Sequence, residues 1–186
     1  MALSVIVPLL ALASLCAAFA PSCDDMVKPY IPLDPKAVFG KWVYVMGAGD
    51  PDPYHRALGS IKSSWVELSP TSDVQTVTLR WGDYLFNQCA LGEVNATLSG
   101  TTVTFQKNLS EHRGHLLQTR ANSLLWTDSF RNVDVTGRFV MQFTRTGTTD
   151  PELVRLFKEQ IACLHFPENF HSYDGTTELC PEASPE

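Results

Sequence analysis

Phe39-Gly40-Lys41-Trp42-Val43-Tyr44-Val45-Met46 is the stretch that decides the fold. Its second half is rich in β-branched and aromatic residues, which suit a pleated, half-buried strand. Trp42, Tyr44 and Met46 share one parity, so a strand directs all three side chains to the same face. Gly40, just before the tryptophan, lets another backbone or side chain come close, which is useful where a barrel must be plugged. We therefore expect a first strand here, anchored by Trp42.

The length and charge of the chain limit what it can be. Its 186 residues are enough for one domain that buries about two thirds of its unfolded surface. The 14 Lys and Arg side chains are outnumbered by 20 Asp and Glu, and no basic stripe is present. Nucleic acid and anionic membrane surfaces are therefore poor partner candidates. A charged fraction of 18% with abundant aromatic residues also argues against disorder of the main body.

The first 20 residues contain no charged side chain and end in small residues. Such a run is typical of a secretory signal peptide that is removed, leaving residues 21–186 as a single domain. A membrane anchor is the alternative, because the run is near the minimum spanning length. We favour the signal peptide, since the polar segment that follows has no basic stop-transfer flank. The sequence thus predicts secretion into plasma or another body fluid, without stable membrane insertion.

Four cysteines remain after removal of the leader: Cys23, Cys89, Cys163 and Cys180. An even number in an oxidising compartment predicts two disulfides, for which three connectivities are possible. A zinc site is disfavoured, because no pair is spaced closely enough.

Two sequons, at Asn95 and Asn108, are predicted N-glycosylation acceptors. Both would have to lie on the outer surface.

Short strands joined by frequent turns follow the first strand, and this pattern predicts an antiparallel barrel or sandwich. A break rich in glycine and proline, residues 47–53, predicts a large open loop, and Gly82-Asp83 predicts a turn. The further strands are predicted at residues 61–68, 74–81, 84–98, 102–107, 115–120, 124–130 and 138–145.

A single helix is predicted after the strands. Asp150 is a good N-cap, Pro151 suits the first helical position, and Pro167 ends the segment. Apolar residues at helical spacing define one buried stripe. They are Leu153, Leu156, Phe157, Ile161 and Leu164.

At this point the chain resembles the lipocalins. Gly40-Lys41-Trp42 matches their first motif, and Thr127-Asp128-Ser129-Phe130 resembles their Thr-Asp-Tyr motif with the tyrosine replaced. Arg145 resembles the arginine that covers the barrel-plugging tryptophan, here Trp42. The resemblance implies an all-β fold: an eight-stranded antiparallel up-and-down barrel, or calyx, with one C-terminal helix packed outside.

The likeness is closer to one branch of the family. The first motif, the segment Glu111-His112-Arg113-Gly114-His115-Leu116-Leu117 and the cysteine layout resemble orosomucoid, the acid glycoprotein of plasma. They also resemble its fish relatives, the tributyltin-binding and saxitoxin-binding plasma proteins. This resemblance implies that Cys23 pairs with Cys163 and Cys89 with Cys180.

A barrel of this size encloses enough volume for one small ligand, and alternation places half of each strand inside. The predicted ligand-binding residues are Tyr44, Met46, Ser64, Val66, Leu68, Val77, Leu79, Trp81, Val103, Phe105 and Leu117 on the strands, with Tyr54, Leu58 and Ile61 at the open mouth. In the last strand we assign Phe139, Met141 and Phe143 outward, under the helix.

Catalysis is not expected. The cysteines are assigned to disulfides, and no histidine is predicted beside Ser63 or Ser64. His112 and His115 are predicted to be surface histidines, because their spacing is loose and no third metal ligand is evident.

We therefore predict a secreted carrier of a small lipophilic molecule, with basic and toxic compounds among the candidate ligands, and no cofactor or metal. The alternatives are an extracellular interaction protein with a filled barrel and a lipid carrier associated with lipoproteins through a retained leader. Plasma proteins and lipoproteins are accordingly the further candidate partners.

Overall fold

The computed structural model describes residues 21–32, 34–107, 109–133 and 135–182. The predicted signal peptide, residues 1–20, and the predicted acceptor Asn108 lie outside the described residues. No helix within the described ranges has the length and apolar character needed to cross a bilayer.

In the described ranges strands dominate: α1 and η1 precede them, α2 lies between β1 and β2, and α3 follows β8. In order, the elements are α1 (Cys23–Met26), the 3-10 helix η1 (Pro35–Val38), β1 (Gly40–Asp50), α2 (Asp52–Gly59), β2 (Ile61–Pro70), β3 (Thr76–Leu85), β4 (Gln88–Ser99), β5 (Thr102–Lys107), β6 (Ser110–Leu117), β7 (Ser123–Arg131), β8 (Thr136–Thr144), α3 (Pro151–Cys163) and β9 (His171–Ser172).

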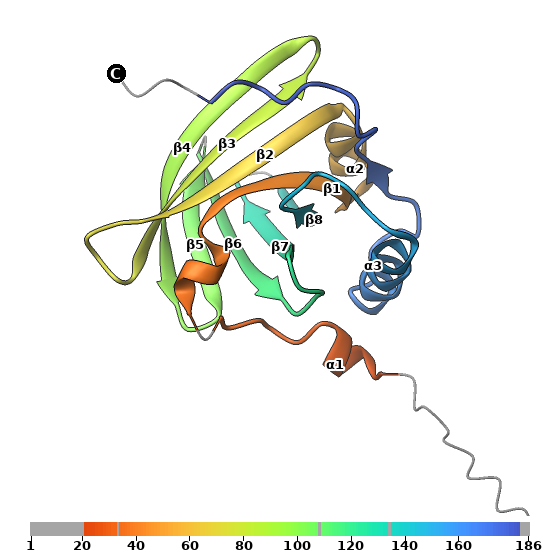
Figure 1. The fold of residues 1–186 in the computed structure, drawn as a ribbon, viewed down its shortest axis with the longest axis horizontal. Coiled ribbons are helices and arrows are strands. Elements are labelled where there is room, and N and C mark those ends of the chain that lie inside the picture. The colour runs from red at the N-terminus through yellow and green to blue at the C-terminus, as the bar shows by residue number, and fades with distance from the viewer. Residues whose placement is uncertain (1–20, 33, 108, 134, 183–186) are drawn as a thin grey trace, which may run out of the picture.

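The strands form a closed antiparallel barrel (Figure 1). Each of β2 to β7 pairs with the next strand in the chain, and β1 closes the ring by pairing with both β2 and β8. The pairing between β4 and β5 is short, because only residues 97–99 pair with residues 102–104. The prediction of an eight-stranded barrel with a helix outside is confirmed, and β9 is a short addition beside β1.

A bulge in β1 changes which residues face the interior. Tyr44 pairs with Phe143 and Met46 with Gln142, so Val45 is an extra residue in the strand. A Cβ atom added to Gly47 would lie 3.1 Å from Tyr44 Cε2, which shows that Gly47 continues the inner face. Met46 therefore faces outward and packs in the cluster that contains the helix α3. The prediction that Met46 points into the calyx was wrong.

The assignment of the last strand was also wrong. Phe139, Met141 and Phe143 lie in the interior cluster with Trp42, while Val140 packs outward in the cluster that contains α3. The outward parity includes Gln142, a polar residue that is fully buried. Its Nε2 donates to the carbonyls of Leu124 at 2.9 Å and Phe143 at 3.2 Å, and these bonds satisfy the amide beneath the helix.

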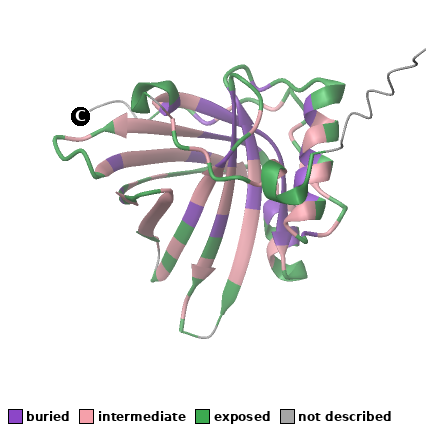
Figure 2. Ribbon diagram, turned by 90° about the horizontal axis from the view of Figure 1, so that it is seen from below, coloured by how far each residue is buried: buried purple, intermediate pink, exposed green. Residues whose placement is uncertain are grey.

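The helix α3 packs against the outside of the barrel (Figures 1 and 2). As predicted, Asp150 caps it: its carboxylate accepts a hydrogen bond from the Leu153 amide at 2.8 Å. Phe157 and Ile161 are almost fully buried against the barrel. Leu117 belongs to this outer cluster, and its predicted inward orientation was wrong by one residue, because Leu116 faces the interior instead.

Three connections differ from the predictions. Residues 47–53 do not form an open loop: β1 continues to Asp50 and α2 begins at Asp52, with a proline in its first turn. Residues 110–114, predicted as a connection, belong to β6. The predicted Gly82-Asp83 turn lies inside β3, and the chain turns instead at Phe86 and Asn87, both with positive φ.

Both predicted disulfides are present. Cys23–Cys163 joins α1 to the end of α3, and Cys89–Cys180 ties the C-terminal tail to the start of β4. The tail is fixed further by Trp65, whose Nε1 donates to the carbonyl of Cys180 at 2.8 Å.

Candidate functional site

The barrel is closed at the end where β1 starts. The Arg145 guanidinium lies 3.5 Å from the centroid of the Trp42 ring. Its nitrogens donate to the carbonyls of Lys41, Ala37 and Phe39 at 2.8 to 3.0 Å. The positive φ of Gly40 suits a residue without a side chain, and a Cβ there would lie 3.3 Å from Arg145 Nη1. Desolvation by burial lowers the pKa of Arg145.

We expect Arg145→Ala to lower the free energy of unfolding by about 2 kcal/mol, because a cation–π contact and charge-assisted bonds are lost together. Arg145→Lys keeps the charge but not the planar fork, so it should recover less than half of this loss. Urea denaturation of both variants measures the effect. Equal stability of Arg145→Ala and the native protein would contradict the role of this contact in closing the barrel.

The inner face of the barrel is apolar and is still reached by solvent. The residues on this face are mostly of intermediate exposure, although the sheet closes on itself. Residues of intermediate exposure are common along the strands (Figure 2). Solvent therefore reaches part of the barrel interior. The partly exposed members of the interior cluster include Val66, Leu68, Leu116, Trp126, Phe139 and Met141.

Most predicted site residues do face this space. Leu79 and Trp81 pair with Leu68 and Val66 across β2 and β3, so they share the inner face. Ser64 and Val77 belong to the same two strands and the same parity, and Val103 and Phe105 lie on β5. Tyr44, Leu58 and Ile61 belong to the interior cluster. Whether any of these residues contacts a ligand stays a prediction.

The mouth of the barrel is partly covered by α2. Tyr54 packs edge-on against the Phe130 ring at 4.7 Å and the Phe139 ring at 6.0 Å. On the other side, His55 is buried with its ring 4.3 Å from that of His171. Desolvation by burial, followed by the proximity of His55, lowers the pKa of His171. The helix is thus held by aromatic contacts on both sides.

A histidine and a carboxylate lie within the calyx. His112 Nδ1 is 2.6 Å from Asp128 Oδ2, and the two side chains are 13% and 5% exposed. The imidazole stacks on Phe105 at 4.7 Å and on Phe130 at 5.6 Å. The prediction that His112 is a surface residue was wrong. His115 has the opposite parity, and its Nδ1 donates to the Thr101 carbonyl at 2.9 Å.

A second polar group lies on β2, β3 and β5. Ser64 Oγ donates to Asp83 Oδ1 at 2.7 Å, and Lys107 Nζ lies 4.1 Å from the centroid of the Trp81 ring. Burial raises the pKa of Asp83, against smaller opposing effects of Ser64 and Lys107. Burial also lowers the pKa of Lys107, although Asp83 and Asp128 oppose that shift.

Sequence reasoning missed the lumenal members of these two groups. Lys107 has the parity of Val103 and Phe105, and Asp128 has that of Trp126 and Phe130, so alternation could have placed both inside. Charged side chains on an otherwise apolar face are normally assigned to solvent, and neither residue was predicted to face the interior.

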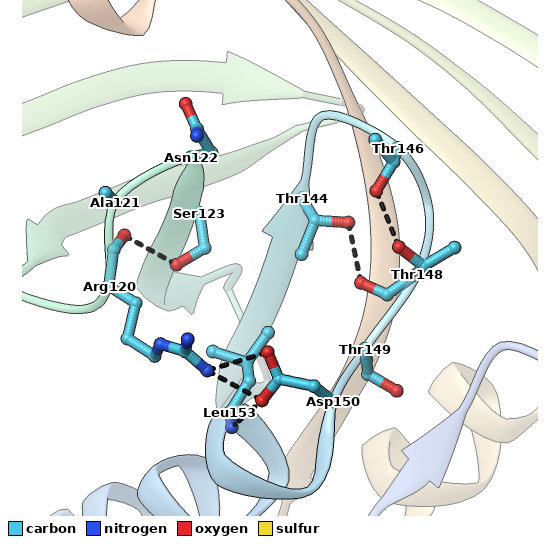
Figure 3. A pocket seen from close by; sticks show the side chains of 10 residues that line it. All are labelled: Arg120, Ala121, Asn122, Ser123, Thr144, Thr146, Thr148, Thr149, Asp150 and Leu153. Atoms are coloured by element: carbon cyan, nitrogen blue, oxygen red, sulfur yellow. Dashed lines mark hydrogen bonds and ion pairs between the residues drawn. The ribbon is translucent and has the colours of Figure 1, made fainter.

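Two surface hollows lie outside the calyx, near the closed end. One of about 210 Å³ lies between the starts of β7 and α3 (Figure 3). There Arg120 and Asp150 pair with each other at 2.6 Å, and the Thr144 hydroxyl donates to the Thr148 carbonyl at 3.2 Å. The other, about 340 Å³, is lined in part by Trp42 and Arg145. These polar groups are mostly paired within the protein, so the calyx remains the better candidate site.

Within the described ranges, no three His, Cys, Asp or Glu side chains gather as a metal site would require. In the same part of the chain, no serine or cysteine is hydrogen-bonded to the His112–Asp128 pair.

Scans against protein-family models and curated proteins gave no match. The structure is similar to several solved ones. The siderocalin Ex-FABP, described as functioning through dual ligand specificities, has a TM-score of 0.67 at 13% identity and covers 78% of this chain and 99% of its own. The bovine lipocalin allergen Bos d 2 has a TM-score of 0.66 at 15% identity and covers 81% and 100%. Aphrodisin, a sex pheromone from the female hamster, has a TM-score of 0.65 at 17% identity and covers 78% and 99%. With its closed barrel, outer helix and Trp42–Arg145 contact, the chain has the lipocalin fold.

Proposed function

We propose that this protein is a secreted, non-catalytic carrier that binds a small lipophilic molecule inside its calyx. The observation that supports this most is the apolar inner face that solvent still reaches inside a closed barrel. Burial of apolar ligand surface there would provide the binding free energy, at about 25 cal/mol per Å² before ordering costs are subtracted. Basic and toxic lipophiles are among the candidate ligands, because aromatic rings in the calyx can hold a cationic group.

Secretion is supported by two disulfides, which persist in oxidising compartments. Asn95 is exposed on the outer parity of β4, where a glycan has room. It stays a predicted acceptor, as Asn108 does.

We expect 2-naphthalenemethanol, a neutral lipophilic probe, to bind saturably and to quench the emission of Trp81 and Trp126. Leu79→Trp places a large ring in the lumen, where it takes up volume that a ligand would need, and should weaken binding roughly tenfold or more, or about 1.4 kcal/mol. Thr78→Trp adds the same ring on the outer parity of β3 and is the matched control. Isothermal titration calorimetry compares the three proteins, because it does not depend on the added tryptophan.

An unchanged affinity in Leu79→Trp, with the variant folded, would place binding outside the calyx. No saturable binding by a panel of neutral lipophiles would count against the carrier function itself.

A further inference from the structure

The Lys107 ammonium lies inside the calyx, where residues of β3, β4 and β5 pack on one another. Gly92 on β4 has no side chain, and a Cβ there would collide with the Trp81 ring. The indole of Trp81 therefore lies against the backbone of β4. Lys107 Nζ lies 4.1 Å from the centroid of that ring. Since Trp81 shares the inner face with Val66, the amine projects into the lumen.

Lys107 lacks a direct polar partner among the described residues. The structure shows no hydrogen bond and no ion pair for its ammonium in those ranges, only the contact with Trp81. Asp83 and Asp128 act on it through longer-range electrostatics. Burial of a lysine without a direct partner disfavours the charged form, in agreement with its lowered pKa. A larger fraction of this side chain is thus the neutral, nucleophilic amine than for a lysine in water.

The charges around Lys107 limit which ligand group suits it. A carboxylate would meet the lysine but also the negative charges of Asp83 and Asp128. A neutral carbonyl compound meets no such repulsion and can be buried at lower cost in an apolar calyx. Condensation with the Lys107 amine, followed by protonation, gives an iminium that carries one positive charge, as the ammonium does. The charge balance with Asp83 and Asp128 is therefore kept.

We propose that Lys107 captures a lipophilic aldehyde in the calyx as an imine. This inference rests on the proposed carrier function and names one substrate class for it. The amine lone pair forms a C–N bond to the carbonyl carbon. The carbonyl oxygen then leaves as water with two hydrogens that come from the amine nitrogen, and the C=N bond forms. Uptake of one proton from water gives the iminium, whose positive charge lies near the carboxylates of Asp83 and Asp128.

The test uses 2-naphthaldehyde with sodium cyanoborohydride, which reduces an iminium to a stable secondary amine. Peptide mass spectrometry after short exposure reads the labelled positions. We expect Lys107 to be labelled about tenfold faster than any other lysine, and this preference to disappear in denaturant. The competing side chains are Lys28, Lys36, Lys41, Lys62 and Lys158. Labelling spread evenly over them, or concentrated on exposed lysines, would overturn the proposal.

Lys107→Arg and Lys107→Met serve as paired variants, since the first keeps the charge and the second the approximate shape without an amine. Both should lose the fast labelling. Binding of 2-naphthalenemethanol, which has the size of the probe but cannot form an imine, is measured for both variants, so that loss of the amine can be distinguished from loss of the calyx. If the native protein binds 2-naphthalenemethanol but 2-naphthaldehyde labels its lysines without preference for Lys107, the aldehyde proposal is wrong and the carrier function is unaffected. Failure of the alcohol to bind the native protein would instead count against the carrier function.

Discussion

Replacing both Cys23 and Cys163 with serine is expected to lower the free energy of unfolding by about 5 kcal/mol. The two cysteines are 140 positions apart, and the chain-entropy model assigns a large stabilisation to a cross-link that closes so long a loop. The bond also joins α1 to the end of α3, so the N-terminal segment loses its covalent attachment. Equilibrium denaturation in urea, without reductant, measures the loss.

Cys89→Ser with Cys180→Ser provides the comparison. This pair closes a shorter loop, with a separation of 91, and should cost about 4–5 kcal/mol. A loss below about 1 kcal/mol in both double variants would show that the unfolded state is already restricted by other structure. Adding reductant to the native protein should reproduce the sum of the two effects only if the barrel remains two-state.

Phe157→Ala should lower the free energy of unfolding by about 3–5 kcal/mol, the range for removing a large buried side chain. Phe157 is 0% exposed and lies in the cluster that joins α3 to the outside of the barrel. Its ring also packs edge-on against Phe170 at 5.3 Å, so the substitution loosens the tail after the helix. Thermal and urea denaturation give the value.

The matched control lies on the same helix. Arg155 is exposed and forms an i,i+4 ion pair with Glu159, so Arg155→Ala should change stability by no more than about 0.5 kcal/mol. If Phe157→Ala cost no more than this control, the helix would not be a stabilising part of the fold.

Much of the architecture could be predicted because it depends on local patterns. Short alternating strands and frequent turns indicated an antiparallel all-β fold, and Asp150 with Pro151 marked the start of the helix. The disulfide pairing followed only from the resemblance to a family, since four cysteines alone leave three connectivities open. The α2 helix was missed because its few buried residues, His55 and Leu58, give a weak apolar pattern next to two prolines.

Side-chain direction was harder to predict where one residue changes the parity. The extra Val45 reverses the second half of β1, and no composition signal marks such a bulge. On β8, the apolar parity of Phe139, Met141 and Phe143 competes with one that carries Val140 and Gln142. The burial of Gln142 depends on the carbonyls of Phe143 and of Leu124 on β7, which the sequence does not reveal. The lumenal charge of Asp128 was missed for a similar reason, because its partner His112 lies on the neighbouring strand β6.

The pairing between β4 and β5 is short, so hydrogen bonding is uneven around the barrel wall. Only residues 97–99 pair with residues 102–104 there, whereas β3 and β4 pair along ten positions. A barrel wall parts most easily where the fewest hydrogen bonds must break, and here the parting would lie beside the strand that carries Lys107. A ligand that enters between β4 and β5 reaches the calyx from the side. The helix α2 and Tyr54, which partly cover the mouth, then need not move when the ligand binds.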